Sequence, residues 1–258
     1  MFPADYKKRT YHEPFIGGGA VLFKIRPESG SINDINPRLM NFYKVVQEKP
    51  EELILRARQY TYDEEAFYKL RDRFNHVRLS EVEQAALLLY LNKTAYNGLY
   101  RVNSRGEFNV PFGRYKNPTI VAESRIRMAS RVLQKVEILN KDFSYVMDYA
   151  QKGDICYLDP PYQPLNETAD FTSYSAEGFS SMEQERLRDL CVDIDESGVL
   201  FVLSNSYTEP IVKLYEETGR FIITVVQARR AINSKASRRG AIDEVLVSNI
   251  RGNKLRLR

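Results

Sequence analysis

The sequence has little of the residue types that build disulfide frameworks or protein metal sites. Only two cysteines and two histidines occur among 258 residues. Cys156 and Cys191 are too few for a disulfide framework and lack zinc-ligand spacing, so we expect no metal. No apolar run approaches the ~18 residues that a membrane span needs, and the N-terminus holds no secretory apolar stretch. We therefore expect a cytoplasmic protein with no membrane partner. A monomer is our expectation in solution, although no sequence feature addresses the oligomeric state.

Ordinary globular composition accompanies these absences. Hydrophobic residues make up 43% of the chain and charged residues 28%. A chain of this length can bury a substantial core, either as one large domain or as a core with an inserted lobe.

Positive charge is concentrated in two stretches. Residues 93–116 hold five Lys or Arg against one acid, and residues 228–258 hold nine against two, although the whole chain carries only +4. Such segregation is typical of a basic face that binds a polyanion. The alternative is that these stretches are simply solvated loops and tails.

Strand and helix signals alternate near both ends of the chain. This alternation predicts an α/β fold with a mostly parallel sheet and helices on both faces. The last two strands have no helix between them, which indicates an antiparallel pair at a sheet edge. We expect strands near 10–14, 31–36, 136–139, 155–158, 199–203, 221–226 and 245–248, and helices from Ala20 and Pro37 and over 119–134, 180–196 and 208–217.

The middle of the chain breaks this alternation. Residues 50–93 have mostly helical periodicity, whereas residues 94–118 are rich in aromatics, Gly and Asn with arginines between them, which indicates a hairpin-like loop. We therefore expect a sheet domain formed by residues 1–49 and 136–258, with residues 50–135 inserted into it.

A glycine turn follows the first strand. Gly17 and Gly19 allow backbone N–H groups to approach a ligand closely. Leu22 occupies the last position of a G-x-G-x-x-G pattern, so a nicotinamide dinucleotide site is disfavoured. Asp34, at the tip of the second strand, could accept both hydroxyls of a ribose. The pair suggests a nucleoside-containing cofactor; the alternative is a tight turn with an ordinary helix cap.

The sharpest signal is Asp159-Pro160-Pro161-Tyr162, directly after the apolar residues 155–158. The carboxyl end of a sheet strand is where α/β proteins bind ligands. Asp159 and the carbonyl of Pro160 could grip both N–H groups of an aromatic amine and stabilise charge that develops as the nitrogen is alkylated. Tyr162 could stack on the aromatic ring that carries this amine. The alternative is a strand-ending turn with a surface tyrosine.

Six blocks of the sequence are informative together: Glu13–Ala20, Asn33–Asn36, Tyr96–Tyr115, Asp159–Tyr162, Phe171–Tyr174 and Leu203–Ser206. In residues and in order they resemble the Dam-type adenine-N6 DNA methyltransferases that act on GATC. The resemblance runs from about residue 11 to the C-terminus, and it implies a Rossmann-like fold, S-adenosyl-L-methionine as cofactor and base flipping of double-stranded DNA.

The resemblance also implies a role for individual residues. Those implied to hold the cofactor are Phe15, Gly17, Gly19, Asp34, Ile35, Asp142, Phe143 and Asp159. Those implied to hold the target adenine are Asp159, Pro160 and Tyr162. Those implied to contact DNA are Tyr96 as a wedge, Asn97 on a phosphate, Leu99, Arg101 and Pro111 as base readers, and Asn103 and Arg114 beside them. For Arg101 and Arg114, phosphate contact alone is the alternative.

Two later segments complete the expected DNA site. Lys235, Arg238 and Arg239 lie in a basic loop that could neutralise phosphates across the duplex. Residues 163–179 are polar and long for a connection, so we expect a lid over the base, with plain disorder as the alternative. Such a protein would be associated with the nucleoid.

One departure from the family concerns the N-terminus. Family members begin with a K-W-x-G-G-K pattern that covers the cofactor, and the residues before Gly17 do not match it. We therefore expect weak cofactor binding, and a non-catalytic DNA-binding protein stays open as an alternative. Methylation of RNA or of a protein amide is another. Neither cysteine follows a proline, so the nucleophile of a cytosine-C5 enzyme is absent. Restriction protection, replication marking and a phage role stay open.

Overall fold

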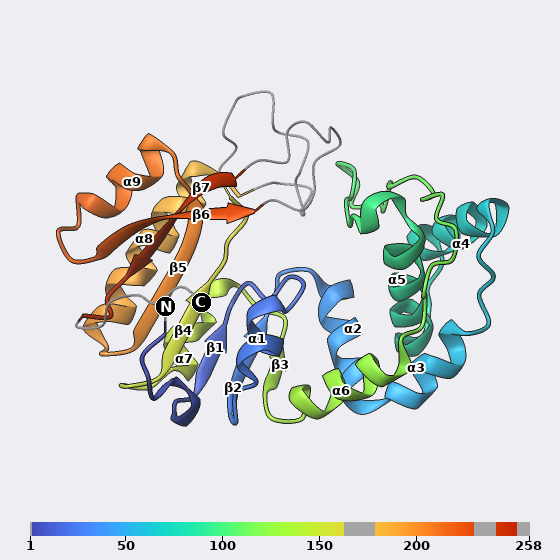
Figure 1. Ribbon diagram of the computed structural model, residues 1–258, viewed down its shortest axis with the longest axis horizontal. Coiled ribbons are helices and arrows are strands. Elements are labelled where there is room, and N and C mark those ends of the chain that lie inside the picture. The colour runs from blue at the N-terminus through green and yellow to red at the C-terminus, as the bar shows by residue number, and fades with distance from the viewer. Residues whose placement is uncertain (1, 163–178, 230–240, 252–258) are drawn as a thin grey trace.

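A seven-stranded sheet forms the centre of the computed structural model, which describes residues 2–162, 179–229 and 241–251 (Figure 1). The strand order is β3-β2-β1-β4-β5-β7-β6, and the pairs among β1 to β5 are parallel. β7 is antiparallel to both β5 and β6. The strands are β1 Tyr11–Glu13, β2 Gly30–Asn33, β3 Glu137–Leu139, β4 Ile155–Leu158, β5 Leu200–Ser206, β6 Ile222–Arg229 and β7 Ala241–Ser248.

This topology confirms the predicted α/β class and the antiparallel pair near one edge. β6 is the edge strand, and β7 lies between it and β5. β7 therefore runs against the other strands, whereas β6, which is antiparallel to β7, has the same direction as β1–β5.

Both faces of the sheet are covered because successive strand residues point to opposite sides. In β4, Ile155 and Tyr157 pack with residues of α1 and α2, whereas Cys156 and Leu158 pack with residues of α7, α8 and α9. The predicted helices on both faces are therefore present (Figure 1). These helices are α1 Ala20–Ile25, α2 Pro37–Glu48, α7 Val146–Tyr149, α8 Ser181–Glu196 and α9 Glu209–Glu216.

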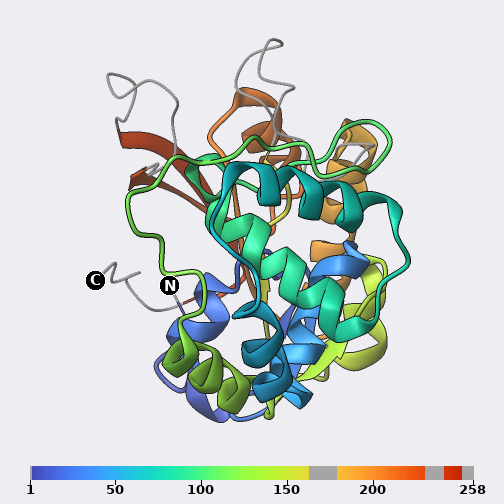
Figure 2. The ribbon, with the colours of Figure 1, turned by 90° about the vertical axis from the view of Figure 1, so that its right-hand side faces the viewer.

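Four further helices form the part of the molecule seen from the front in Figure 2. They are α3 Pro50–Ala57, α4 Glu64–His76, α5 Glu81–Thr94 and α6 Glu123–Leu133. α5 is buried on all sides over Ala85–Leu91, which explains why its sequence is apolar without a polar face. Its Ala85 and Leu89 join the core that begins at the sheet, whereas Leu87 and Tyr90 join a second, outer core.

The chain folds back on itself after α5, as the composition of this segment predicted. We call residues 95–115 the 95–115 hairpin. Antiparallel bridges join Ala95 to Phe112 and Val102 to Phe108. Phe108 and Val110 anchor the hairpin in the outer core, beside Phe67 and Leu91.

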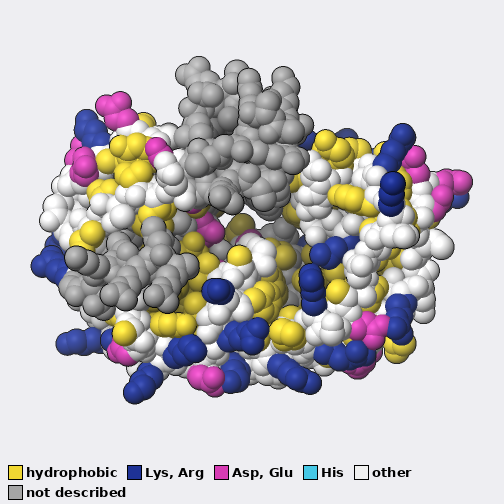
Figure 3. All heavy atoms as spheres, viewed as in Figure 1, with side chains coloured by type: hydrophobic (Ala, Val, Ile, Leu, Met, Phe, Trp, Pro, Cys, Tyr) yellow, Lys and Arg dark blue, Asp and Glu magenta, His cyan; other side chains and the backbone are white. Residues whose placement is uncertain are grey.

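Figure 3 shows that the viewed face is hollowed between the sheet and the part formed by helices α3–α6. No helix in the described ranges is long and apolar enough to cross a membrane.

Candidate active site

The strand order reverses between β1 and β4, and this point organises the site. Glu13 ends β1 and Asp159 follows β4, so both stand at the carboxyl ends of neighbouring parallel strands. In open α/β sheets the connections on either side of such a switch point diverge, and ligands bind in the crevice that this leaves. The glycine turn and the Asp159–Tyr162 turn border this crevice.

The glycine turn presents an open backbone. Gly17 has φ +45° and Gly19 has φ +70°, conformations that favour glycine. A Cβ added at Gly17 or Gly18 would meet nothing within 4 Å, so this side of the turn is accessible to a ligand. The Tyr43 hydroxyl donates to the Gly17 carbonyl at 2.8 Å and fixes the turn on α2.

Asp34 lies directly after β2 and faces that turn. Its Oδ2 accepts the Gly17 N–H at 3.2 Å, and its Oδ1 accepts the Asn36 N–H at 2.9 Å. Burial raises the pKa of Asp34, and the two N–H groups oppose that shift. Ile35 beside it is 66% exposed. An oriented carboxylate next to an exposed apolar side chain fits the ribose and base of a nucleoside.

Phe15, two residues before Gly17, contacts Phe143, the chain neighbour of Asp142. The rings of Phe15 and Phe143 are 5.3 Å apart. Asp142 accepts hydrogen bonds from the Ser144 N–H and from Arg186 Nη2, each at 3.0 Å. Burial works against ionisation, but hydrogen bonds from the Ser144 hydroxyl and N–H, together with the charge of Arg186, prevail and lower the pKa of Asp142. An anionic Asp142 suits the charged ammonium end of a bound amino acid.

Asp159 is oriented by the neighbouring strand. Ser204 on β5 donates to Asp159 Oδ1 at 2.8 Å, and the Tyr157 hydroxyl lies 3.0 Å from Ser204 Oγ. Protein atoms around the carboxylate raise its pKa, while hydrogen bonds from Ser204 and Tyr162 oppose the shift. Asp159 as a residue is nevertheless exposed to solvent. Exposure and a raised pKa are compatible if the carboxylate lies at the bottom of a hollow that water reaches from one side only.

The turn after Asp159 is rigid. Pro160 is buried, and the Pro161 carbonyl accepts a hydrogen bond from Gln184 Nε2 at 3.3 Å. Gln184 is itself held by Asn205 Nδ2 at 3.0 Å, so α8 and β5 together fix the turn. Burial, and then the charge of Asp159, raise the pKa of Tyr162, which keeps its phenol protonated.

Glu13 joins this group, although the sequence pattern gave it no role. It is 2% exposed, and its Oε2 accepts the Tyr11 hydroxyl at 2.7 Å. Burial, with a further contribution from the charge of Asp159, raises the pKa of Glu13 to about 8. A neutral carboxylic acid therefore lies at the base of the site at neutral pH.

Several residues that support the site were not predicted. Tyr43 and Gln184 carry no local sequence signal, because their contacts depend on distant turns. Ser204 lies in the block Leu203–Ser206, whose resemblance to the family was the one available signal. No group of three or more His, Cys, Asp or Glu that could hold a metal ion occurs within residues 2–162, 179–229 and 241–251.

Seven of the ten predicted DNA-contacting residues lie on the 95–115 hairpin. Tyr96 is 45% exposed, Asn97 has φ +55°, and Pro111 is exposed. Leu99 and Arg101 are half-buried. These five residues share one short segment, but their contact with DNA stays a prediction.

Two other predicted DNA contacts are already engaged within the protein. The Asn103 Oδ1 atom accepts the N–H groups of Arg105 and Glu107, each at 3.0 Å, so Asn103 closes the hairpin turn. The Arg114 side chain is 81% exposed and lies 3.5 Å from Glu64. Lys235, Arg238 and Arg239, the block Phe171–Tyr174 and all of the expected lid except Phe179 lie outside the described residues.

Comparison with known proteins identifies the family. Residues 1–232 match the D12 class N6 adenine-specific DNA methyltransferases. The type II methyltransferase M1.LlaDCHI of Lactococcus lactis subsp. cremoris is 44% identical over 96% of this chain and 88% of its own length. M.MjaIII of Methanocaldococcus jannaschii is 44% identical over 93% and 88%. A DNA adenine methylase of Serratia marcescens is 36% identical over 91% and 87%. The chain therefore belongs to the D12 class of N6 adenine-specific DNA methyltransferases, enzymes that use S-adenosylmethionine.

Proposed function

We propose that this enzyme methylates the N6 amino group of adenine within GATC in double-stranded DNA, after turning the adenine out of the helix. The observation that carries the proposal is the position of Asp159 and the rigid Pro160–Tyr162 turn at the switch point, next to the open glycine turn. Methyl donor and target amine would meet there.

The residues present fit S-adenosylmethionine. Asp34 would accept the ribose hydroxyls, Ile35 would cover the adenine ring, and the open backbone of Gly17 would face the methionine portion. Asp142 would attract the ammonium group, and Phe15 and Phe143 would line the space between. When bound, S-adenosylmethionine supplies an electrophilic methyl group on a sulfonium.

Asp159 acts on the amine of the target base. The lone pair of an adenine N6 is conjugated into the ring and is a poor nucleophile. Hydrogen bonds from the amine to Asp159 and to the Pro160 carbonyl hold the nitrogen towards tetrahedral geometry and stabilise the positive charge that develops on it. The nitrogen then loses one of its two protons, and Asp159 is the acceptor already bonded to it. Tyr162, with its phenol protonated, stacks on the base.

Turning the base out of the helix is required by access, because a paired adenine is stacked inside the duplex. We propose that residues 50–135 provide target recognition, with the 95–115 hairpin against the DNA, and that residues 1–49 and 136–258 provide catalysis. Tyr96 would fill the space that the base leaves, Asn97 would bind a phosphate, and Arg101 would read a guanine. One chain contributes all of these residues, so a monomer suffices.

Methyl transfer to matched duplexes tests this proposal. One duplex contains a single GATC, and the others carry one changed base pair in that site or no adenine in it. We expect transfer to GATC, with each change lowering kcat/KM by about tenfold or more. A duplex with 2-aminopurine at the target position should fluoresce more strongly on binding, since the base is unstacked. Equal transfer to all adenine-containing duplexes would contradict the specificity, and unchanged fluorescence would contradict base flipping.

A further inference from the structure

The 95–115 hairpin holds Arg101 in a fixed position through a neutral partner. Arg101 Nε donates to Asn109 Oδ1 at 2.8 Å, and the Asn109 N–H donates to the Arg101 carbonyl at 3.1 Å. The neighbouring arginines differ, because Arg105 pairs with Glu107 and Arg114 pairs with Glu64. The Asn109 amide binds Nε of Arg101 and is uncharged. Both terminal nitrogens of Arg101, with its full positive charge, are therefore left for two acceptor atoms that lie in one plane, such as those on the edge of a base.

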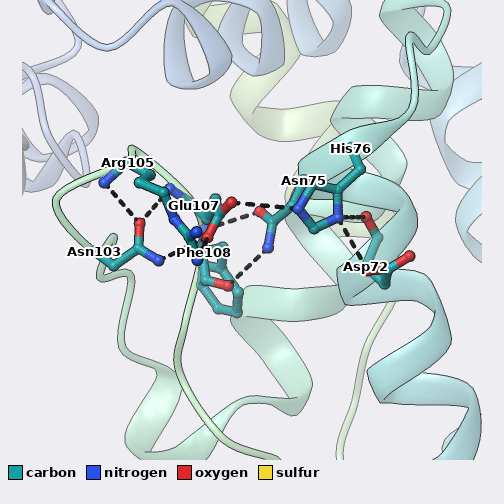
Figure 4. Close-up of polar contacts among 7 residues, drawn as sticks. All are labelled: Asp72, Asn75, His76, Asn103, Arg105, Glu107 and Phe108. Carbon is teal, nitrogen blue, oxygen red and sulfur yellow. Dashed lines mark hydrogen bonds and ion pairs between the residues drawn. The ribbon is translucent and has the colours of Figure 1, made fainter.

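The position of Asn109 depends in turn on helix α4. Asn75 on α4 binds the backbone of Phe108 on both sides of its Cα: Asn75 Oδ1 accepts the Phe108 N–H at 2.9 Å, and Asn75 Nδ2 donates to the Phe108 carbonyl at 3.0 Å. Figure 4 shows the Asn75 side chain reaching from the helix to this strand of the hairpin. The amide thus pairs with the backbone as a neighbouring β-strand would, directly before Asn109.

Asn75 makes its contacts at the edge of the outer core, where the buried Phe108 is followed by the half-buried Asn109. A hollow of about 200 Å³, lined by α4 and the hairpin, lies beside Asn75 and Asn109. Two single contacts flank the Asn75 pair: Arg71 Nη1 donates to the Val110 carbonyl at 3.2 Å, and His76 Nε2 lies 3.3 Å from Glu107. Asn75 is the double contact between them, so its loss should shift the Phe108–Asn109 backbone most.

From this chain of contacts we infer that Asn109 and Asn75 are positioning residues for sequence reading: Asn109 aims Arg101, and Asn75 places Asn109. The inference rests on the proposed reading of a guanine by Arg101. A bidentate contact with guanine O6 and N7 requires the guanidinium plane to lie in the plane of the base. An arginine held at Nε has the orientation of its guanidinium restricted before binding, whereas a free arginine must lose that side-chain entropy on binding.

The test compares discrimination at each base pair. We would measure kcat/KM for GATC and for duplexes with one changed base pair. The discrimination ratio at a base pair is kcat/KM for GATC divided by kcat/KM for the duplex changed at that base pair. Arg101→Ala should lower the ratio at one base pair by about tenfold or more. Asn109→Ala should lower it at the same base pair by about three- to tenfold, and the Arg101→Ala/Asn109→Ala double variant should be no worse than Arg101→Ala alone. Asn109→Asp keeps the acceptor for Nε but pairs Arg101 with a charge, so its ratio should lie between those of Asn109→Ala and the parent.

Asn75→Ala should lower the ratio at that same base pair, with a smaller effect than Asn109→Ala. Glu65→Ala is the matched control, because Glu65 lies on α4 and its one ion pair within the described part of the chain is with the exposed Lys69. Thermal unfolding of each variant separates loss of folding from loss of reading, and Asn75→Asp, which keeps the acceptor for the Phe108 N–H, supplies an intermediate if Asn75→Ala does not fold.

The two proposals fail in different ways. Suppose that Arg101→Ala lowers discrimination at one base pair. If Asn109→Ala then leaves discrimination unchanged, lowers it at a different base pair, or has an effect that adds fully to that of Arg101→Ala, the positioning role is wrong and the reading role stands. If Arg101→Ala lowers kcat/KM equally for all duplexes, Arg101 binds phosphate, and both the reading role and this inference are wrong.

Discussion

The hydroxyl of Ser204 donates to Oδ1 of Asp159 at 2.8 Å, across 45 positions of sequence. Ser204 has one proton, so the Tyr157 hydroxyl, 3.0 Å from Ser204 Oγ, must be the donor in that second contact. A directed relay from Tyr157 through Ser204 thus fixes one oxygen of Asp159 and leaves acceptor capacity on the other. Since β4 and β5 are parallel neighbours, the sheet itself sets this geometry.

Replacing Ser204 with alanine should slow catalysis without weakening binding. Loss of a hydrogen bond to a charged group should lower kcat by about tenfold, because Asp159 is no longer oriented. The same bond lowers the pKa of Asp159, so its loss should move the acidic limb of the pH–rate profile to higher pH. Single-turnover rates between pH 4.5 and 8 measure both effects. Ser204→Thr keeps the hydroxyl and should behave as the parent; an unshifted limb in Ser204→Ala would exclude the relay.

Replacing Asp159 with alanine should abolish transfer while duplex binding is largely kept. One preorganised acceptor at the reacting centre is worth about 100-fold or more in rate, whereas phosphate contacts supply most of the affinity for DNA. Methyl-transfer rates and fluorescence anisotropy with a labelled GATC duplex measure the two quantities. Asp159→Asn keeps one acceptor oxygen and should be less impaired. A rate above about a tenth of the parent's in Asp159→Ala would rule out the assigned role.

Asp34 should govern cofactor binding and not DNA binding. Asp34→Ala removes the predicted ribose acceptor and also frees the Gly17 and Asn36 N–H groups. We expect the Kd for S-adenosylmethionine, measured by calorimetry, to rise about tenfold or more. Asp34→Asn keeps an acceptor oxygen and should lie between the two. DNA binding in the absence of cofactor should be unchanged in both variants, and a cofactor affinity unaffected by Asp34→Ala would refute this placement of the ribose.

Much of the fold could be predicted because its signals are local. The apolar residues 155–158 form β4, the expected helix over 180–196 is α8, and the two strands expected at 221–226 and 245–248 form the antiparallel pair β6 and β7. Continuous burial also explains the apolar run of α5. Each of these signals lies within a single element or a single connection, so no knowledge of strand order was needed.

The supporting contacts of the site could not be predicted in this way. Ser204 reaches Asp159 only because β5 pairs with β4, and Asn75 reaches Phe108 only because α4 packs beside the hairpin. Glu13 was part of a recognised block, yet nothing in its neighbourhood shows that the fold buries it. Hydrogen bonds between distant segments leave no periodicity in the sequence, so such partners become visible only when strand order and helix packing are known.

Glu13 should make the protein less stable as the pH rises. Its pKa in the folded protein is about 8, against an ordinary value of 4.5. Between these values the folded state holds a proton that the unfolded chain has released, so the free energy of unfolding falls with increasing pH and levels off above about 8. From pH 6.5 to 8 the loss should be on the order of 2 kcal/mol, because one proton separates the two states over that range.

Urea unfolding of the parent and of Glu13→Gln, measured at intervals between pH 6.5 and 9, tests this expectation. The glutamine stays neutral and can still accept the Tyr11 hydroxyl, so its profile should lack the part of the decline that Glu13 causes. Burial lowers the pKa of His12 from 6.5, so the effect of His12 on the free energy of unfolding falls mainly below pH 6.5. Any decline due to other groups, such as His76, is common to both proteins and cancels in their difference. Glu185→Gln, on the exposed face of α8, should follow the parent. Parallel profiles for the parent and Glu13→Gln would mean that Glu13 is ionised in the folded protein at neutral pH.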